Sequence, residues 1–329
     1  MRLNPLGHSA VRVSELAFGA AGIGNLFTPV TDAQAGRTVA AAWQAGIRYF
    51  DTAPHYGLGL SERRLGEALS NLPRDQYVLS TKVGRLLEPT PTVGDDLANG
   101  FAVPATHRRR WDFSAQGVRR SIEESLNRLD VERIDIAYLH DPDDHAEQAL
   151  TEAYPALEGL RAEGVLGAIG AGMNQAGLLA RFIRETDLDV VLLAGRYSLL
   201  DQRGLAELLP LAAERGVGVV IGGVFNSGLL ADPRPGATYD YTTAPDDLLA
   251  RALALKTVCE RHGVPLRAAA LRFPLGHPAV ASVLVGARDA DQACDAAAML
   301  GHPVPAALWE ELKSRALIPP GAPTPEETP

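Results

Sequence analysis

The strongest constraint on the fold of this chain is a regular alternation of short apolar runs with segments of helical spacing. Eight runs of strand length are each followed by such a segment. The runs cover residues 14–18, 47–51, 77–82, 134–140, 166–170, 190–194, 217–221 and 282–285. Eight βα units in strict alternation are typical of a closed parallel barrel, so we predict an α/β chain folded as a single-domain (β/α)₈ TIM barrel.

Local helix signals support this division of the chain. Thr31 is followed three residues later by Gln34, a capping-box pattern, and Gly46 is a typical stop for that helix. Ser114 is a good N-cap for the helix that follows, and Gly164 marks the end of another helical segment.

Two long segments between the elements face the same end of the predicted barrel. They cover residues 84–113 and 222–244, after the third and seventh strands, and are rich in Gly and Pro. We expect them to form long loops on the catalytic face. The barrel itself is predicted to occupy residues 1–318, and the Pro-rich residues 319–329 are expected to be a flexible C-terminal tail.

Composition excludes several classes of partner. The chain has 31 Lys and Arg against 40 Asp and Glu, a net charge of −9, which argues against general binding to nucleic acid or to anionic membrane. No apolar signal segment or membrane-length run is present, and two cysteines are too few for a disulfide framework. We therefore expect a cytoplasmic protein with a small-molecule substrate. The sequence leaves its oligomeric state open.

Four polar residues stand at or just after the ends of predicted strands. Asp51 closes the second strand and Tyr56 follows it, while Lys82 and His140 close the third and fourth. In a parallel barrel, catalytic groups come from the carboxyl ends of several strands, so these side chains are expected to converge. Each taken singly is usually a surface group; the coincidence of all four favours a catalytic site.

The four side chains suit proton transfer at a carbonyl or hydroxyl oxygen. A nearby ammonium lowers the pKa of a phenol, so we expect Lys82 to poise Tyr56 as a phenolate, with Asp51 as the counter-charge of Lys82. His140 would orient the reacting oxygen and share its proton. No side chain carries out hydride chemistry, so a redox reaction here requires a cofactor.

The motifs around these residues resemble those of the aldo-keto reductase superfamily. The stretch Asp51-Thr-Ala-Pro-His-Tyr56-Gly-Leu-Gly-Leu-Ser-Glu62 is similar to the family's most specific signature, and the residues around Lys82 and His140 are similar to its other catalytic blocks. The similarity covers about residues 10 to 300. It implies a (β/α)₈ barrel, a bound NAD or NADP without a Rossmann domain, and the tetrad Asp51, Tyr56, Lys82 and His140 with Tyr56 as acid/base.

Several further stretches resemble the aldose 1-dehydrogenase branch, which includes L-fucose, L-galactose, D-threo-aldose and pyridoxal dehydrogenases. They are residues 18–25, 112–114, 140–145 and 172–174. This resemblance implies oxidation of C1 of an aldose such as L-fucose to the lactone. A general aldehyde or ketone reductase, or a pyridoxal dehydrogenase, is the alternative within the same superfamily.

The resemblance also implies a set of cofactor contacts. Tyr197 would stack on the nicotinamide, and Ala194 replaces the Gln that is usual before it. The remaining positions lie after strands one, two, five, seven and eight: Gly19, Ala20, Asp51, Asn174, Gly223, Phe225, Asn226, Gly286, Ala287, Arg288, Gln292 and Asp295.

The positions after strand eight predict a preference for NAD. Many NADP-dependent members place a Lys and an Arg where this chain has Gly286 and Gln292, which leaves Arg288 as the nearby cation. A 2′-phosphate prefers basic partners, whereas a free ribose hydroxyl is suited by an acceptor such as Asp295.

Competing interpretations use other parts of the sequence. Gly19, Gly22 and Gly24 are spaced G-x-x-G-x-G, not as a dinucleotide fingerprint. The run 140–145, with Asp51 and His55, has the residue types of a metal-dependent hydrolase site, but that reading leaves Tyr56 and Lys82 without roles.

Two more interpretations remain. The basic cluster 107–111 is either a solvated patch or a lid segment on the catalytic face. A non-catalytic regulatory subunit is a third class of function, although all four catalytic residue types are present.

Overall fold

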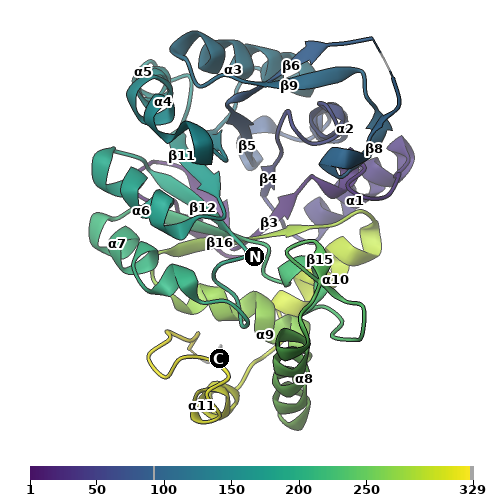
Figure 1. Ribbon diagram of the computed structural model, residues 1–329, viewed down its shortest axis with the longest axis vertical. Coiled ribbons are helices and arrows are strands. Elements are labelled where there is room, and N and C mark those ends of the chain that lie inside the picture. The colour runs from purple at the N-terminus through teal and green to yellow at the C-terminus, as the bar shows by residue number, and fades with distance from the viewer. Residues whose placement is uncertain (92, 327–329) are drawn as a thin grey trace.

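A closed barrel of eight parallel strands forms the centre of the computed structural model, which describes residues 1–91 and 93–326 (Figure 1). The barrel strands are β3 (Leu16–Gly19), β4 (Tyr49–Asp51), β5 (Val78–Val83), β10 (Ile136–His140), β11 (Ala168–Met173), β12 (Val190–Ala194), β13 (Gly218–Gly222) and β16 (Val280–Gly286). They are neighbours in chain order, and β16 closes on β3 with Gly286 beside Gly19. The predicted (β/α)₈ fold is confirmed.

Helices surround the strands (Figure 1). They are α1 (Asp32–Gln44), α2 (Leu60–Leu69), α3 (Ala115–Leu129), α4 (Ala146–Gln148), α5 (Tyr154–Ala162), α6 (Ala176–Glu185), α7 (Leu208–Arg215), α8 (Asp246–Arg261), α9 (Leu266–Arg272), α10 (Ala290–Leu300) and α11 (Ala306–Ser314). Thr31 and Ser114 cap α1 and α3 through their side chains, as their positions in the sequence predict. The helical segment that ends just before Gly164 contains a π-helical stretch, Ala149–Ala153, between α4 and α5.

Alternation along each strand divides the core into two layers. Leu16 and Phe18 of β3 pack outward in the large cluster under the helices, whereas Ala17 between them packs in the barrel interior. The hairpin of β1 (Leu3–Pro5) and β2 (Arg12–Ser14), which sequence analysis did not identify, adds Leu6 and Val13 to the interior cluster.

Both long segments on the catalytic face contain strands, in contrast to the expected loops. After β5, strand β6 (Arg85–Pro89) pairs with β9 (His107–Trp111), and β7 (Asp95–Asp96) pairs with β8 (Phe101–Pro104). After β13, β14 (Thr238–Tyr239) pairs with β15 (Thr242–Thr243). Pairing satisfies backbone groups that a long irregular loop would leave to water.

The described part of the C-terminal tail also differs from the expected flexible segment. Ala322 is buried in the large core cluster, and Gly276 lies close against the backbone of Thr324. Proline restricts the unfolded chain, so a Pro-rich segment loses little entropy when it packs. Residues 327–329 lie outside the described residues. None of the described helices is long and apolar enough to cross a membrane.

The contact between α2 and α3 generates a stability prediction. A Cβ added at Gly66 of α2 would lie 1.9 Å from the carbonyl oxygen of Leu129, so Gly66→Ala forces these backbones apart. We expect a loss of about 1–3 kcal/mol in the free energy of unfolding. The measurement is the urea unfolding midpoint followed by circular dichroism.

Gly36→Ala in α1 is the matched control. A Cβ there meets nothing within 4 Å, so the substitution should stabilise the helix by about 0.5–1 kcal/mol. Equal midpoints for the two variants would contradict the assigned contact.

Candidate active site

The four residues predicted to be catalytic lie together at the carboxyl ends of neighbouring strands. Asp51 ends β4, Lys82 lies near the end of β5 and His140 ends β10, and these strands are adjacent in the barrel. Tyr56 lies between β4 and α2, with its ring centroid 4.9 Å from Lys82 Nζ and 5.9 Å from the His140 ring.

A buried ion pair forms the base of this group. Lys82 Nζ lies 2.6 Å from Asp51 Oδ2 and donates a second hydrogen bond to the carbonyl oxygen of Thr52 at 2.9 Å. The two side chains are only 3% and 1% exposed. Burial alone lowers the pKa of Lys82, but Asp51 and Tyr56 outweigh it and the net pKa is raised. Lys82 is therefore a permanent cation beside the phenol.

The second carboxylate oxygen of Asp51 accepts a hydrogen bond from a side chain in the barrel interior. Ser80 Oγ lies 2.6 Å from Asp51 Oδ1 and 3.2 Å from the Tyr49 hydroxyl, which in turn lies 2.9 Å from the Tyr138 hydroxyl. A carboxylate only accepts hydrogen bonds, so Ser80 donates to Asp51. Ser80 and Lys82 share one face of β5 because residues two apart point the same way. Sequence analysis did not identify this network.

The pKa of Tyr56 corrects one expectation. Desolvation by burial raises it, and the nearby Lys82 lowers it by less, so the net pKa lies above the ordinary value of 10.0. The side chain is therefore a phenol at neutral pH, not the poised phenolate predicted from the sequence. A protonated phenol is the form required of a general acid.

His140 is a neutral imidazole in this arrangement. Burial, followed by the charges of Arg85 and Lys82, lowers its pKa well below the ordinary value. Its Nε2 lies 3.6 Å from Asp141 Oδ2, and its buried Nδ1 has no hydrogen-bond partner among the described residues. A neutral imidazole has one donor and one acceptor nitrogen, which suits it to orient a reacting oxygen.

A cavity of about 450 Å³ opens above these side chains. Lys82, Tyr56 and His140 line it together with the predicted cofactor residues Asn174, Gly223 and Asn226. Its remaining walls come largely from segments after other strands, and they include Phe27, His55, Asn99, Phe101, Asp141, Asp240 and Tyr241. Sequence analysis did not assign these wall residues to the site, although several lie in the two long segments it placed on this face.

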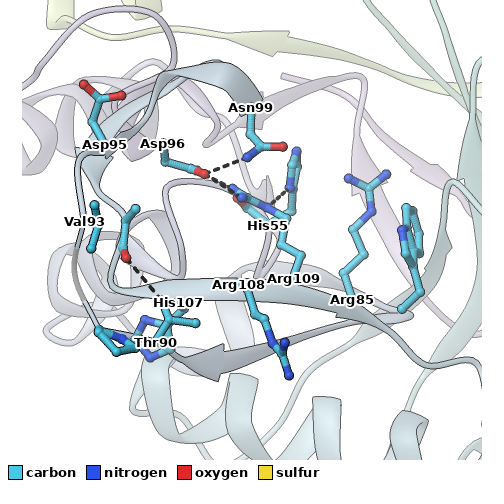
Figure 2. Close-up of a pocket in the computed structure, with 13 residues that line it drawn as sticks. His55, Arg85, Thr90, Val93, Asp95, Asp96, Asn99, His107, Arg108 and Arg109 are labelled. Carbon is cyan, nitrogen blue, oxygen red and sulfur yellow. Dashed lines mark hydrogen bonds and ion pairs between the residues drawn. The ribbon is translucent and has the colours of Figure 1, made fainter.

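A second cavity, of about 480 Å³, lies beside the first (Figure 2). It is enclosed by the strands β6 and β9 and the segment around Asp96, and His55 borders both cavities. Of the basic cluster 107–111, Arg109 points toward Asp96 and His55 (Figure 2). Arg108 and Arg110 instead pair with Glu88 across the strand pair.

Small residues at the other strand ends leave room for an extended ligand. The ends of β3, β13 and β16 carry Gly19, Gly222 and Gly286, and a Cβ at any of them would meet its nearest neighbour no closer than 3.5 Å. Glycine permits close approach of a ligand to the backbone. One half of the barrel mouth thus carries the polar tetrad and the other half is flat, an arrangement that fits a bound dinucleotide next to the reacting groups.

The placement of Tyr197 does not fit the stacking role implied by the resemblance. Its ring is completely buried, packs 5.2 Å from Phe273 and is not among the residues lining the mouth cavity. We therefore assign Tyr197 to the core. Phe225 is half-buried and also packs against the core, and Ala20 lies below the mouth, where its N–H donates to the Asp51 carbonyl oxygen.

The predicted contacts after strand eight form a separate group near the start of α10. Arg288 donates to Thr28 Oγ1 at 3.1 Å, and its own N–H donates to Gln292 Oε1. Ala287 is buried. Asp295 pairs with Arg267 of α9 at 2.9 Å, a partner that the sequence did not indicate.

The ligand-rich run 140–145 is not gathered into a metal site. Over residues 1–91 and 93–326, no group of three or more His, Cys, Asp or Glu is arranged to hold a metal ion. Asp141 instead pairs with Arg85, and Nδ1 of His55 accepts a hydrogen bond from Arg109. The hydrolase interpretation therefore lacks its ligand cluster in the described part of the chain.

Several curated proteins are similar in sequence to this chain over most of its length. A D-threo-aldose 1-dehydrogenase from Pseudomonas sp is 49% identical over 94% of this chain and 96% of its own length. A pyridoxal 4-dehydrogenase from Microbacterium luteolum is 41% identical (95% and 97% covered). An L-galactose dehydrogenase from Arabidopsis thaliana is 33% identical (89% and 86% covered).

Solved structures show the same architecture. The holo form of an aldo-keto reductase from Bacillus halodurans superposes with a TM-score of 0.75 at 28% identity and covers 99% of this chain and 98% of its own. The model of the Aldo/keto reductase family matches residues 15–316. With the tetrad at the barrel mouth, these similarities show that this chain belongs to the aldo/keto reductase family and is an NAD(P)-dependent oxidoreductase.

Proposed function

We propose that this enzyme oxidises C1 of an aldose, such as L-fucose or a related sugar, to the lactone. The observation that carries the proposal is the convergence of Tyr56, His140 and Lys82 in a cavity whose largely apolar walls also carry several polar side chains. Asn99, Asp141 and Asp240 line the cavity beside their partners Asp96, Arg85 and Arg196, and the remaining lone pairs of their oxygens can accept hydrogen bonds from sugar hydroxyls, which a site for simple aldehydes does not need. The 49% identity to a D-threo-aldose 1-dehydrogenase supports the same substrate class.

In this proposal the proton is transferred by residues of the chain itself. In oxidation the phenolate form of Tyr56 accepts the proton of the C1 hydroxyl, and in reduction the phenol donates its proton to the carbonyl oxygen. Lys82, held by Asp51, stabilises the phenolate that acts as base in oxidation and is left after proton donation in reduction, and neutral His140 orients the reacting oxygen. A bound nicotinamide supplies the hydride acceptor that no side chain provides.

We propose that the flat half of the barrel mouth holds the cofactor. Asn174, Gly223 and Asn226 line the cavity and would contact it near the reacting groups. Gly19 and Ala20 would lie beneath it, and Gly286, Ala287, Arg288, Gln292 and Asp295 would meet its far end. We favour NAD over NADP because Asp289 and Asp291 lie at the start of α10 beside Arg288, and Arg267 is already paired with Asp295, so Arg288 is left as the nearby cation for a 2′-phosphate.

A pyridoxal dehydrogenase is the second candidate function. The rings of Phe27 and Tyr241 lie 5.6 Å apart at the mouth, and Phe101 lies 6.0 Å from Tyr56, so the cavity also has aromatic walls suited to a flat ring. The relative at 41% identity is named for pyridoxal oxidation.

A substrate panel tests the proposed function. Aldoses including L-fucose, together with pyridoxal and simple aldehydes or alcohols, are compared by NADH and NADPH absorbance, and the product is analysed for a lactone. We expect kcat/KM to be highest for an aldose. A higher value for pyridoxal would favour the second candidate, and a preference for simple aldehydes would contradict both.

Tyr56→Phe tests the acid/base role. Loss of the phenol should lower kcat by about 10²-fold or more, while binding of the cofactor, followed by fluorescence quenching, stays nearly unchanged. Tyr154→Phe on the surface of α5 is the control, because its hydroxyl bonds only Glu158 and the Asp187 N–H among the described residues. Wild-type turnover in Tyr56→Phe would contradict the assignment of Tyr56 as the acid/base.

The raised pKa of Tyr56 predicts opposite pH profiles for the two directions. Oxidation needs the phenolate, whose fraction increases as pH rises toward the raised pKa, so kcat/KM for oxidation should climb from neutral to alkaline pH. Reduction needs the phenol and should stay level until pH approaches that pKa. A profile for oxidation that is already level at neutral pH would show that the phenol is more acidic in the working enzyme.

Cofactor preference is measured as kcat/KM for NAD against NADP. We expect NAD to be favoured. Gln292→Arg should lower the ratio of kcat/KM for NAD to kcat/KM for NADP, because it adds a partner for the 2′-phosphate. A tenfold or greater advantage for NADP in the wild type would contradict the prediction.

A further inference from the structure

His55, the residue before the catalytic tyrosine, occupies the wall between the two cavities. Its ring lies 5.7 Å from the His140 ring and 6.0 Å from the Tyr56 ring, and it meets Phe101 edge-on at 5.2 Å. The imidazole is therefore within the group of side chains that surrounds the reacting oxygen, although nothing in the tetrad chemistry uses it.

Arg109 fixes one side of this imidazole. Its Nε donates to His55 Nδ1 at 2.5 Å and its Nη2 donates to the His55 carbonyl oxygen at 2.9 Å (Figure 2). Asp96 holds the guanidinium through both of its oxygens, at 2.8 and 2.5 Å. Arg109 and Asp96 are only 11% and 5% exposed, so this ion pair is largely screened from water.

The chemistry of the two groups determines where the imidazole proton lies. A guanidinium has only donors, so Nδ1 must be the acceptor of this hydrogen bond. In a neutral imidazole the proton is then on Nε2, and protonating Nδ1 would place two N–H groups against each other. Nε2 has no hydrogen-bond partner among the described residues, so its N–H remains available to the mouth cavity, which His55 lines.

We infer that His55 is a specificity-determining residue: Arg109 holds it as the Nε2–H tautomer, and it donates a hydrogen bond to a substrate oxygen on the carbon next to the reacting carbon. This inference rests on the proposed function, because it takes Tyr56 and His140 as the groups at the reacting oxygen. The rings of His55, Tyr56 and His140 have centroids 5.7 to 6.0 Å apart, so the three side chains surround a common space in which His55 can reach an oxygen next to the reacting one. The recognised class is thus a 2-hydroxy aldehyde or its cyclic hemiacetal.

The surrounding charges keep this donor neutral across the physiological range. Burial, then the positive charges of Arg85, Arg109 and Lys82, lowers the pKa of His55 to about 2. The charged and titratable groups around it are Tyr56, Lys82, Arg85, Asp96, Arg109, His140 and Asp141. Because Asp96 is paired with Arg109 and Asp141 with Arg85, neither carboxylate in this group is free to favour the cation of His55, and His140 is also neutral.

Matched substrates give the first test. Lactaldehyde carries a hydroxyl next to the carbonyl and propanal lacks it, and reduction of each by the full-length enzyme is followed as loss of NADH or NADPH absorbance. His55→Phe should lower kcat/KM for lactaldehyde roughly tenfold, the value of one lost hydrogen bond, mainly through KM, and leave propanal within about twofold. His55→Gln, whose amide nitrogen reaches near the position of Nε2, should recover part of the loss.

The two substrates separate recognition from folding. Equal losses for lactaldehyde and propanal in His55→Phe would overturn the inference, since a structural defect affects both alike. No loss for either would also overturn it. If the wild type prefers lactaldehyde in a manner that depends on His55 but oxidises no aldose, the proposed function fails while the role of His55 stands.

A spectroscopic test does not depend on turnover. The imidazole ¹⁵N signals of His55, identified by their absence in His55→Gln, should report the neutral Nε2–H tautomer from about pH 5 to 9. In Arg109→Gln, which removes one nearby positive charge and the guanidinium donor, the pKa of His55 should rise and the Nδ1–H tautomer should become detectable. An Nδ1–H tautomer in the wild type, or a His55 that titrates in this range with Arg109 present, would overturn the inference.

Discussion

The buried ion pair of Asp51 and Lys82 is the interaction on which the active site depends. Both charges have left water, and such a pair is stable only when its geometry is good and its remaining hydrogen-bonding groups are satisfied. Lys82 meets this condition through Thr52, and Asp51 meets it through Ser80. Adjacent parallel strands bring the two residues together, so the barrel closure that places β4 beside β5 also places the charges.

Burial and charge act in opposite directions on the phenol above this pair. Lys82 lowers the pKa of Tyr56, but loss of water around the ring raises it more. The resting site therefore holds Tyr56 as a phenol and His140 as a neutral imidazole, a state ready to donate a proton to a carbonyl oxygen. The same low-polarity surroundings that raise the pKa of Tyr56 strengthen every hydrogen bond made to a substrate there.

The strands at the barrel mouth fall into two groups, one with polar side chains and one with small residues at the strand ends. Strands β4, β5 and β10 contribute long polar side chains, while β3, β13 and β16 end in glycine. The hairpins after β5 add the remaining recognition surface, and Arg109 links this added surface to the tetrad through His55. In the proposed function, specificity and catalysis are supplied by different segments on a shared scaffold, as is general for this barrel architecture.

The sequence by itself determined the eight βα units, the residues of the tetrad and the family, because hydrophobic periodicity and the motif around Asp51 and Tyr56 are local properties of the chain. It did not determine that Tyr197 belongs to the core, that segments 84–113 and 222–244 form paired strands, or that Ser80 and Tyr49 support Asp51. Each of these depends on contacts between residues that are distant in sequence. The net pKa of Tyr56 was decided only by the tertiary structure for the same reason, since it follows from how much water the assembled walls exclude, and no sequence pattern records that quantity.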